Sequence, residues 1–168
     1  SQDDVIQIAA VEIVRGEKGR EFEVYLKTGR SLEETERIHN ISALFLEEHG
    51  VDPKEGLRAF ADFVAGDRLA AHNLSFDSEM LLAALERCGM DDAGLESLSG
   101  DESFDTLDLV RRLHPKRLSY TLADLLADFA RAEMVESCPV FFEGFFFHFA
   151  AKRLCRAESG YPAFYHGR

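Results

Sequence analysis

The chain is poor in cysteine, with three in 168 residues: Cys88, Cys138 and Cys155. Neither their number nor their spacing matches a disulfide framework or a zinc site, so we expect a reducing compartment, the cytoplasm. Long hydrophobic runs are also lacking. The longest apolar cluster, residues 141–151, is interrupted by Glu143 and His148 and is too short to span a bilayer. No signal peptide is visible at the start, and we therefore expect no association with a membrane.

Positive charge is scarce. The sequence has 19 Lys and Arg residues against 31 Asp and Glu, which gives a formal net charge of −12. Most nucleic-acid-binding proteins have a basic surface, so this balance weakly favours a protein that binds no nucleic acid. A metal-dependent nuclease is not excluded, because it gathers carboxylates around divalent cations that contact the phosphates. The remaining composition, 46% hydrophobic and 30% charged, is typical of a globular protein, and the length fits one domain.

The first part of the chain has the pattern of an α/β protein. Residues 4–14 are nearly continuously apolar and rich in β-branched side chains, as expected of a central strand. Residues 20–27 alternate polar and apolar side chains after a turn at Gly16–Gly19, which predicts a half-buried partner strand in a hairpin. Helices are predicted over residues 42–49 and 53–65, and each is followed by a glycine.

A short strand that leads directly into a helix lies at the centre of the sequence pattern. Residues 69–71 are apolar, as in a buried strand, and a helical repeat of apolar residues begins soon afterwards. Ser75 is the expected N-cap, which places Asp77 in the first helical turn, where the helix dipole favours a carboxylate. Such a junction delivers the carboxylate to the carboxyl edge of a sheet, where α/β folds bind ligands. An ordinary capped helix start explains these residues equally well.

The C-terminal part differs in composition from the rest. Residues 138–168 contain seven of the fourteen phenylalanines. Residues 140–156 can form a helix, but it would be apolar nearly all round, which implies burial or contact with a partner. Residues 158–168 show no periodicity, and we expect an irregular aromatic tail there.

Several motifs resemble those of the DEDDh family of 3′→5′ exonucleases, which includes RNase T and the proofreading subunit of bacterial DNA polymerase III. His72-Asn73-x-x-Phe76-Asp77 is similar to the second motif of that family. Further segments match in order and spacing: residues 6–11, 38–42, 104–115 and 119–125. The resemblance implies an α/β, RNase H-like fold with a mixed central sheet flanked by helices. The exonuclease-like domain would cover residues 1–157 and precede the tail.

The resemblance also implies metal-dependent hydrolysis of phosphodiester bonds. In this family four carboxylates hold two Mg²⁺ or Mn²⁺ ions, one of which generates hydroxide while the other stabilises the leaving oxygen. Asp77 and Glu143 match two of these positions and would be the catalytic, metal-binding residues. Four further residues would position and stack the terminal nucleotide of a single-stranded DNA or RNA 3′ end: Ile38, His39, Asn73 and Phe76.

The sequence departs from the family at its first and last motifs. The Asp-x-Glu that the family places on its first strand does not occur in a strand context, and the sequence begins where that strand would have ended. In the last motif, Cys138 stands at the position of the general-base histidine and Glu143 at that of an aspartate. A cysteine is a poor base near neutral pH, and a longer carboxylate is displaced. We therefore expect an incomplete metal site and impaired hydrolysis.

The missing first strand also matters for the fold. It would lie in the middle of the sheet, and its absence would leave two neighbouring strands with unpaired edges. The phenylalanine-rich segment or a second copy of the chain could fill the gap.

Two functions are consistent with these observations. The first is a 3′→5′ exonuclease domain that acts on single-stranded DNA or RNA ends with impaired hydrolysis. The alternative is a catalytically inactive pseudo-exonuclease that serves as a nucleic-acid-binding or protein-interaction module. In that case residues 140–151 would dock on a protein partner or a second protomer. An Asp-x-Glu strand encoded upstream would favour the enzyme, and a native start without it would favour the module.

Overall fold

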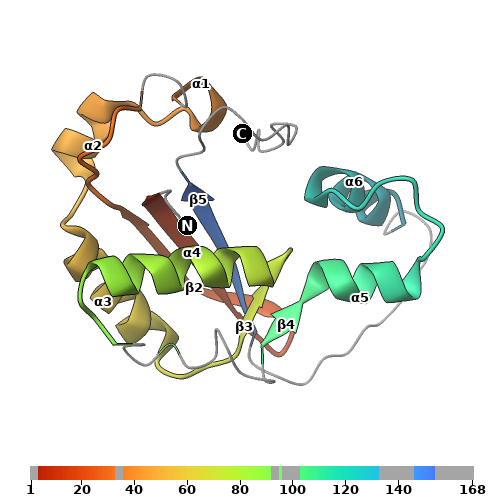
Figure 1. Ribbon diagram of the computed structural model, residues 1–168. Coiled ribbons are helices and arrows are strands. Elements are labelled where there is room, and N and C mark those ends of the chain that lie inside the picture. Colours follow the sequence, from red (N-terminus) through yellow and green to blue (C-terminus); the bar gives the residue numbers. More distant parts are fainter. Residues whose placement is uncertain (1–3, 33–35, 92–94, 96–102, 133–145, 154–168) are drawn as a thin grey trace.

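A mixed sheet of five strands, in the order β2-β1-β5-β3-β4, forms the centre of the fold (Figure 1). The strands are β1 (Val5–Val14), β2 (Glu17–Tyr25), β3 (Leu69–Ala71), β4 (Phe104–Asp105) and β5 (Phe146–Arg153). The structure is a computed structural model that describes residues 4–32, 36–91, 95, 103–132 and 146–153. The α/β architecture with a mixed sheet is the one predicted from the sequence.

The N-terminal hairpin forms as predicted, although its turn is shorter. β1 and β2 are antiparallel, and Val14 pairs with Glu17, so the loop consists of Arg15 and Gly16 alone. Both loop residues have positive φ, 53° and 81°. This combination is typical of the type I′ turn, whose twist matches that of the two strands it joins.

The described helices are α1 (Glu36–His39), α2 (Ala43–His49), α3 (Pro53–Val64), α4 (Leu74–Arg87), α5 (Thr106–Leu113) and α6 (Leu122–Ala132). α2 and α3 begin and end close to the predicted positions. Ser42 caps α2 by accepting from the N–H of Phe45, and Asp52 caps α3, which has Pro53 in its first turn. Among the described residues, no helix has both the length and the apolar character needed to cross a bilayer.

The main core lies between the sheet and the pair of helices α3 and α4, which contact each other (Figure 1). α3 contacts β2, and α4 contacts β1, β3, β4 and β5. Its fully buried side chains come from β1 (Ile8), α3 (Leu57, Phe60), β3 (Leu69) and α4 (Leu81). Each such side chain contributes about 1.5–3 kcal/mol by leaving water. A smaller cluster, in which Ile6 packs with Leu32, Ile41 and Leu46, anchors the segment around α1 and α2.

β5 corrects the expectation for residues 140–156. The predicted helix is wrong, because Phe146–Arg153 form a strand. β5 is antiparallel to β1, with Ala150 opposite Ala9, and parallel to β3, with His148 opposite Ala70. The hypothesis that the phenylalanine-rich segment fills the gap in the sheet is therefore confirmed.

The physical reason for the error is that a nearly all-apolar segment fits a buried helix and a buried strand equally well. Here the strand is favoured, because β1 and β3 each present an edge of N–H and C=O groups that only a strand can pair. With both of its own edges paired, β5 offers no free edge for a further strand. Docking of a partner on residues 140–151 stays a prediction, and residues 140–145 lie outside the described part of the chain.

Candidate functional site

The junction between β3 and α4 is a short buried strand that leads directly into a helix, as predicted, but the N-cap residue differs from the predicted one. Leu69–Ala71 are buried, and α4 starts at Leu74, so the N-cap is Asn73 and not Ser75. Asn73 has φ 75° and ψ 51°, in the left-handed region that Asn tolerates better than most residues, and its side chain makes no capping hydrogen bond. The chain therefore turns sharply here, and another group has to satisfy the first N–H groups of α4.

That group is the carboxylate of Asp105. Oδ1 accepts hydrogen bonds from the N–H groups of Asn73 (3.0 Å) and Leu107 (2.8 Å), and Oδ2 accepts from the N–H of Leu74 (2.9 Å). Asp105 ends β4, where it is opposite Ala71, and it is also the N-cap of α5. One carboxylate thus caps two helices and complements both dipoles. The sequence analysis missed this role, although an Asp between a strand and a helix is a recognisable capping signal.

His72 ties the junction to the loop between α5 and α6. Its Nε2 lies 2.7 Å from the carbonyl oxygen of Tyr120, which can only accept, so Nε2 carries a proton. Its Nδ1 lies 3.1 Å from Oγ1 of Thr106, and that hydroxyl donates to the carbonyl of Ala71 (3.2 Å). Both ring nitrogens are occupied by structural contacts, so this histidine holds the site in place.

Asp77, the predicted catalytic and metal-binding residue, lies in the first turn of α4 and is only 8% exposed. Ser78 beside it is also buried, and its Oγ has no hydrogen-bond partner within the described residues. A carboxylate at this position is stabilised by the N-terminal dipole of the helix. The structure therefore places a shielded carboxylate at the carboxyl edge of the sheet, one helical turn from Asn73.

The residues predicted to contact the nucleotide differ in their surroundings. Asn73 is exposed, and Phe76 is partly buried with its ring packed against the main core. His39 is buried at 8% exposure, and its Nδ1 accepts from the N–H of Ile41 (3.1 Å), so this nitrogen serves the local turn. Ile38 lies in α1, and its side chain is outside the described part of the structure.

α1 and the start of α4 lie toward the same edge of the sheet. β5 and β3 are parallel neighbours, so their carboxyl ends meet at one edge. Figure 1 shows α1 on the side toward which β5 points, while α4 follows the carboxyl end of β3. The fold thus brings the two predicted nucleotide-binding segments to one edge.

The described residues do not supply a two-ion metal site. Within them, no three His, Cys, Asp or Glu side chains gather closely enough to hold a metal ion. The carboxylate of Asp105 is occupied by three backbone N–H groups, and β5 contains no Asp or Glu. Glu143, the second predicted ligand, lies outside the described residues. Asp77 by itself does not fit two ions, each of which needs several oxygen ligands.

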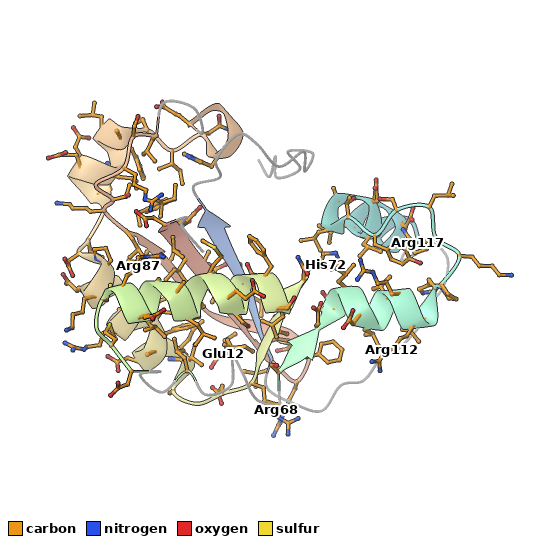
Figure 2. All side chains as sticks on the ribbon, in the orientation of Figure 1. Glu12, Arg68, His72, Arg87, Arg112 and Arg117 are labelled. Carbon is orange, nitrogen blue, oxygen red and sulfur yellow. The ribbon has the colours of Figure 1, made fainter. Side chains whose placement is uncertain are left out.

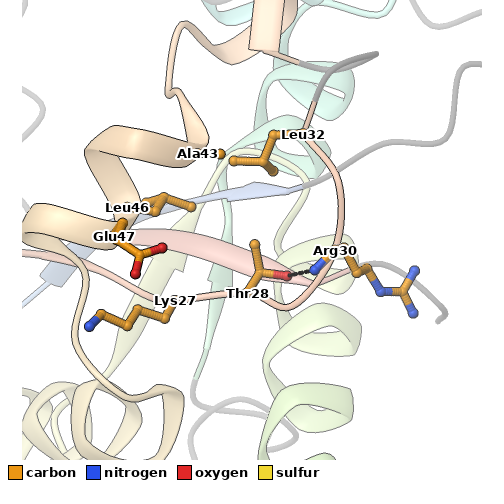
Figure 3. A pocket seen from close by; sticks show the side chains of 7 residues that line it. All are labelled: Lys27, Thr28, Arg30, Leu32, Ala43, Leu46 and Glu47. Carbon is orange, nitrogen blue, oxygen red and sulfur yellow. Dashed lines mark hydrogen bonds between the residues drawn. The ribbon is translucent and has the colours of Figure 1, made fainter.

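A separate pocket of about 140 Å³ lies beside α2 (Figure 3). Its lining residues are Lys27, Thr28, Arg30, Leu32, Ala43, Leu46 and Glu47. The pocket contains none of the predicted site residues. The hydroxyl of Thr28 donates to Asp4 (2.7 Å), which also pairs with Arg30 and Arg87, so this region fastens the start of β1.

Comparison with known proteins identifies the class to which this fold and junction belong. The family model described as an exonuclease, RNase T, matches residues 1–133. The chain therefore belongs to the RNase T family of exonucleases. The family and the RNase H-like fold predicted from the motifs are confirmed.

The relatives with similar sequences are large polymerases. The chain is 33% identical over 125 residues to the PolC-type DNA polymerase III of Latilactobacillus sakei. The matched region covers 73% of this chain and 8% of the polymerase. The chain is also 30% identical over 129 residues to the enzyme of the same name from Listeria welshimeri. That match covers 76% of this chain and 8% of the polymerase. The chain thus spans about 8% of the length of these relatives.

Proposed function

We propose that this chain is a DEDDh-type 3′→5′ exonuclease domain that binds the single-stranded 3′ end of DNA or RNA, with hydrolysis impaired in these 168 residues. The observation that supports it is the buried carboxylate of Asp77 at the carboxyl edge of the sheet, in the first turn of the helix that follows β3. The relatives are DNA polymerases, which favours DNA as the substrate.

In this proposal each predicted residue acts at the 3′ end of the bound nucleic acid. Asp77 and Glu143 would hold Mg²⁺ or Mn²⁺, and the metal would supply the hydroxide and stabilise the leaving oxygen. Ile38 and His39 on α1, and Asn73 and Phe76 at the start of α4, would position and stack the terminal nucleotide. The domain comprises residues 1–157, with the tail at 158–168 outside it.

The central strand supports the proposal that hydrolysis is impaired. β5 lies between β1 and β3, the place that the resemblance assigns to the strand with Asp-x-Glu, and β5 has no carboxylate. Two of the four ligands would then be missing. The same observation favours the second candidate, a pseudo-exonuclease that binds nucleic acid or a protein without cleaving. β5 pairs with both β1 and β3 without supplying a carboxylate.

A nuclease assay on the whole chain tests these candidates. Single-stranded DNA and RNA labelled at the 5′ end would be incubated with Mn²⁺ and the wild type, Asp77→Ala or the control Asp62→Asn. Asp62 is an exposed carboxylate on α3. The exonuclease predicts slow stepwise shortening from the 3′ end. That rate should fall about 100-fold or more in Asp77→Ala, the scale of losing one group that stabilises a transition state, and stay unchanged in the control.

Fluorescence anisotropy on the same oligonucleotides separates the remaining outcomes. Binding without shortening, weakened by a 3′-terminal phosphate, supports the pseudo-exonuclease. Neither binding nor shortening by a folded wild type contradicts the exonuclease and leaves the pseudo-exonuclease as a protein-interaction module only.

A further inference from the structure

Residues 111–117, here called the basic segment, are positively charged in a chain whose net charge is negative. Four of the 19 Lys and Arg residues, and none of the 31 Asp and Glu residues, lie between Leu109 and Ala123. This stretch has a charge of +4, so the rest of the chain has −16. An anionic strand is repelled by most of this molecule, and a compact positive region is where it can bind.

Three cations of the basic segment are exposed, at the end of α5 and in the loop after it: Arg111, Arg112 and Lys116. Arg111 makes a loose ion pair with Asp108 (3.8 Å), and both side chains are more than half exposed. Exposed pairs of this kind contribute little, so Arg111 can exchange its partner for a phosphate at small cost. Arg112 and Lys116 form no ion pair among the described residues.

Arg117 has a different role, because it is fixed within the protein. Its guanidinium pairs with Asp128 of α6 and donates to the carbonyl of Ser119 (3.1 Å). Figure 2 shows Arg117 between α5 and α6, while Arg112 projects from the other side of α5. Arg117 therefore fastens the loop that contains Lys116 to α6.

The basic segment is rigidly linked to the junction that holds Asp77. Tyr120 accepts from His72 through its carbonyl and donates through its hydroxyl to the carbonyl of His114 (2.7 Å). Thr106, at the start of α5, contacts the same histidine. At about 1.5 Å per residue, Arg112 lies about 9 Å along α5 from Thr106.

Apolar and aromatic groups accompany the charges. Leu113 and Leu118 are 63% and 105% exposed, and the Arg111 guanidinium lies 5.9 Å from the centre of the Tyr120 ring. Proteins that bind single strands combine cations along the backbone path with flat or apolar groups for the bases. The basic segment has both.

We propose that the basic segment binds the phosphates of a single-stranded nucleic acid a few nucleotides upstream of the 3′ end. This inference rests on the proposed function, since that function places the 3′ end beside Asp77. It adds a second contact region, which holds the strand while the terminal nucleotide lies at the junction.

The test compares two variants with the same change in charge. Arg111→Gln, Arg112→Gln and Lys116→Gln together remove the proposed contacts. The control removes three exposed cations elsewhere: Lys27→Gln, Lys54→Gln and Arg58→Gln. Binding of a labelled thymidine trinucleotide and of a thymidine dodecamer is measured by anisotropy over a range of KCl concentrations, after circular dichroism has verified folding.

For the dodecamer we plot the logarithm of the association constant against the logarithm of the salt concentration. Each phosphate contact contributes about 0.7 to the steepness of this plot, so removing three contacts should make it shallower by about 2. The affinity of the basic-segment variant should fall on the order of 10- to 100-fold near 0.1 M salt. The trinucleotide, which reaches only the junction, should bind equally well to both variants and the wild type. The control should bind the dodecamer like the wild type.

The outcomes distinguish the two proposals. An equal loss in the control variant, or a dodecamer affinity that the triple substitution does not change, overturns the role of the basic segment and leaves 3′-end binding intact. A salt-dependent loss that is the same for dodecamers with and without a 3′-terminal phosphate supports the basic segment and contradicts end recognition. A wild type that binds neither oligonucleotide overturns both.

Discussion

β3 and β5 are adjacent parallel strands that end at the same edge of the sheet, yet they contribute to the site unequally. β3 leads into a sharp turn and a helix that hold Asp77 in a buried position. β5 completes the sheet between β1 and β3 and brings no carboxylate to that edge. A sheet needs only backbone partners and apolar side chains, whereas a metal site needs particular residues.

The two strands also differ in how much of the sheet they hold together. β3 pairs with β4 and with β5 over two residues each, while β5 pairs with β1 from Phe146 to Arg153. The largest effect should therefore come from breaking β5. Ala150→Pro removes a backbone N–H in the central strand, and a ladder acceptor left without its donor costs about 1–3 kcal/mol. We expect a lower urea midpoint, measured by circular dichroism.

Ala150→Ser retains the N–H and is the control for that substitution. It should shift the midpoint much less than the proline does. A proline variant as stable as the wild type would show that this residue is not part of the sheet.

A smaller effect should follow from the shared cap at the junction. Asp105→Ala leaves three backbone N–H groups without their acceptor, and we expect a loss of about 2 kcal/mol in the free energy of unfolding. Asp105→Asn keeps one oxygen acceptor and should lose less. If Asp105→Ala destabilised the protein no more than Asp62→Ala on the surface of α3, the carboxylate would not hold the two helices.

The smallest effect concerns the start of α6, next to the loop that contacts His72. The hydroxyl of Ser119 first, and that of Thr121 second, donate to the Asp124 carboxylate and hold its pKa below the usual 3.8. Its stabilising contribution is therefore complete above that value and lost as the pH falls through the lower pKa of the folded state. The difference in melting temperature between wild type and Asp124→Asn should persist at neutral pH and shrink below about pH 4. A constant difference across this range would contradict the contact.

The sequence predicted most of what depends on local pattern. The hairpin, α2 and α3 follow from alternation, periodicity and capping residues, and the motif around Asp77 identified the family. For the β3–α4 junction the strand and the helix were predicted but the cap was not, because Asp105 is about 30 residues away in sequence and lies on the neighbouring strand β4. β5 was assigned to a helix, since its apolar residues lack a period that distinguishes the two structures.

Hydrogen exchange along β1 tests most directly whether the phenylalanine-rich segment completes the sheet. In an antiparallel strand successive N–H groups point to opposite edges, so β1 presents alternate amides to β2 and to β5. With β5 in place, both sets of amides between Ile8 and Val11 are hydrogen-bonded and should exchange slowly in NMR spectra. Protection of every second amide only, with the others exchanging rapidly, would show that β1 lacks a partner on that side and would contradict the account.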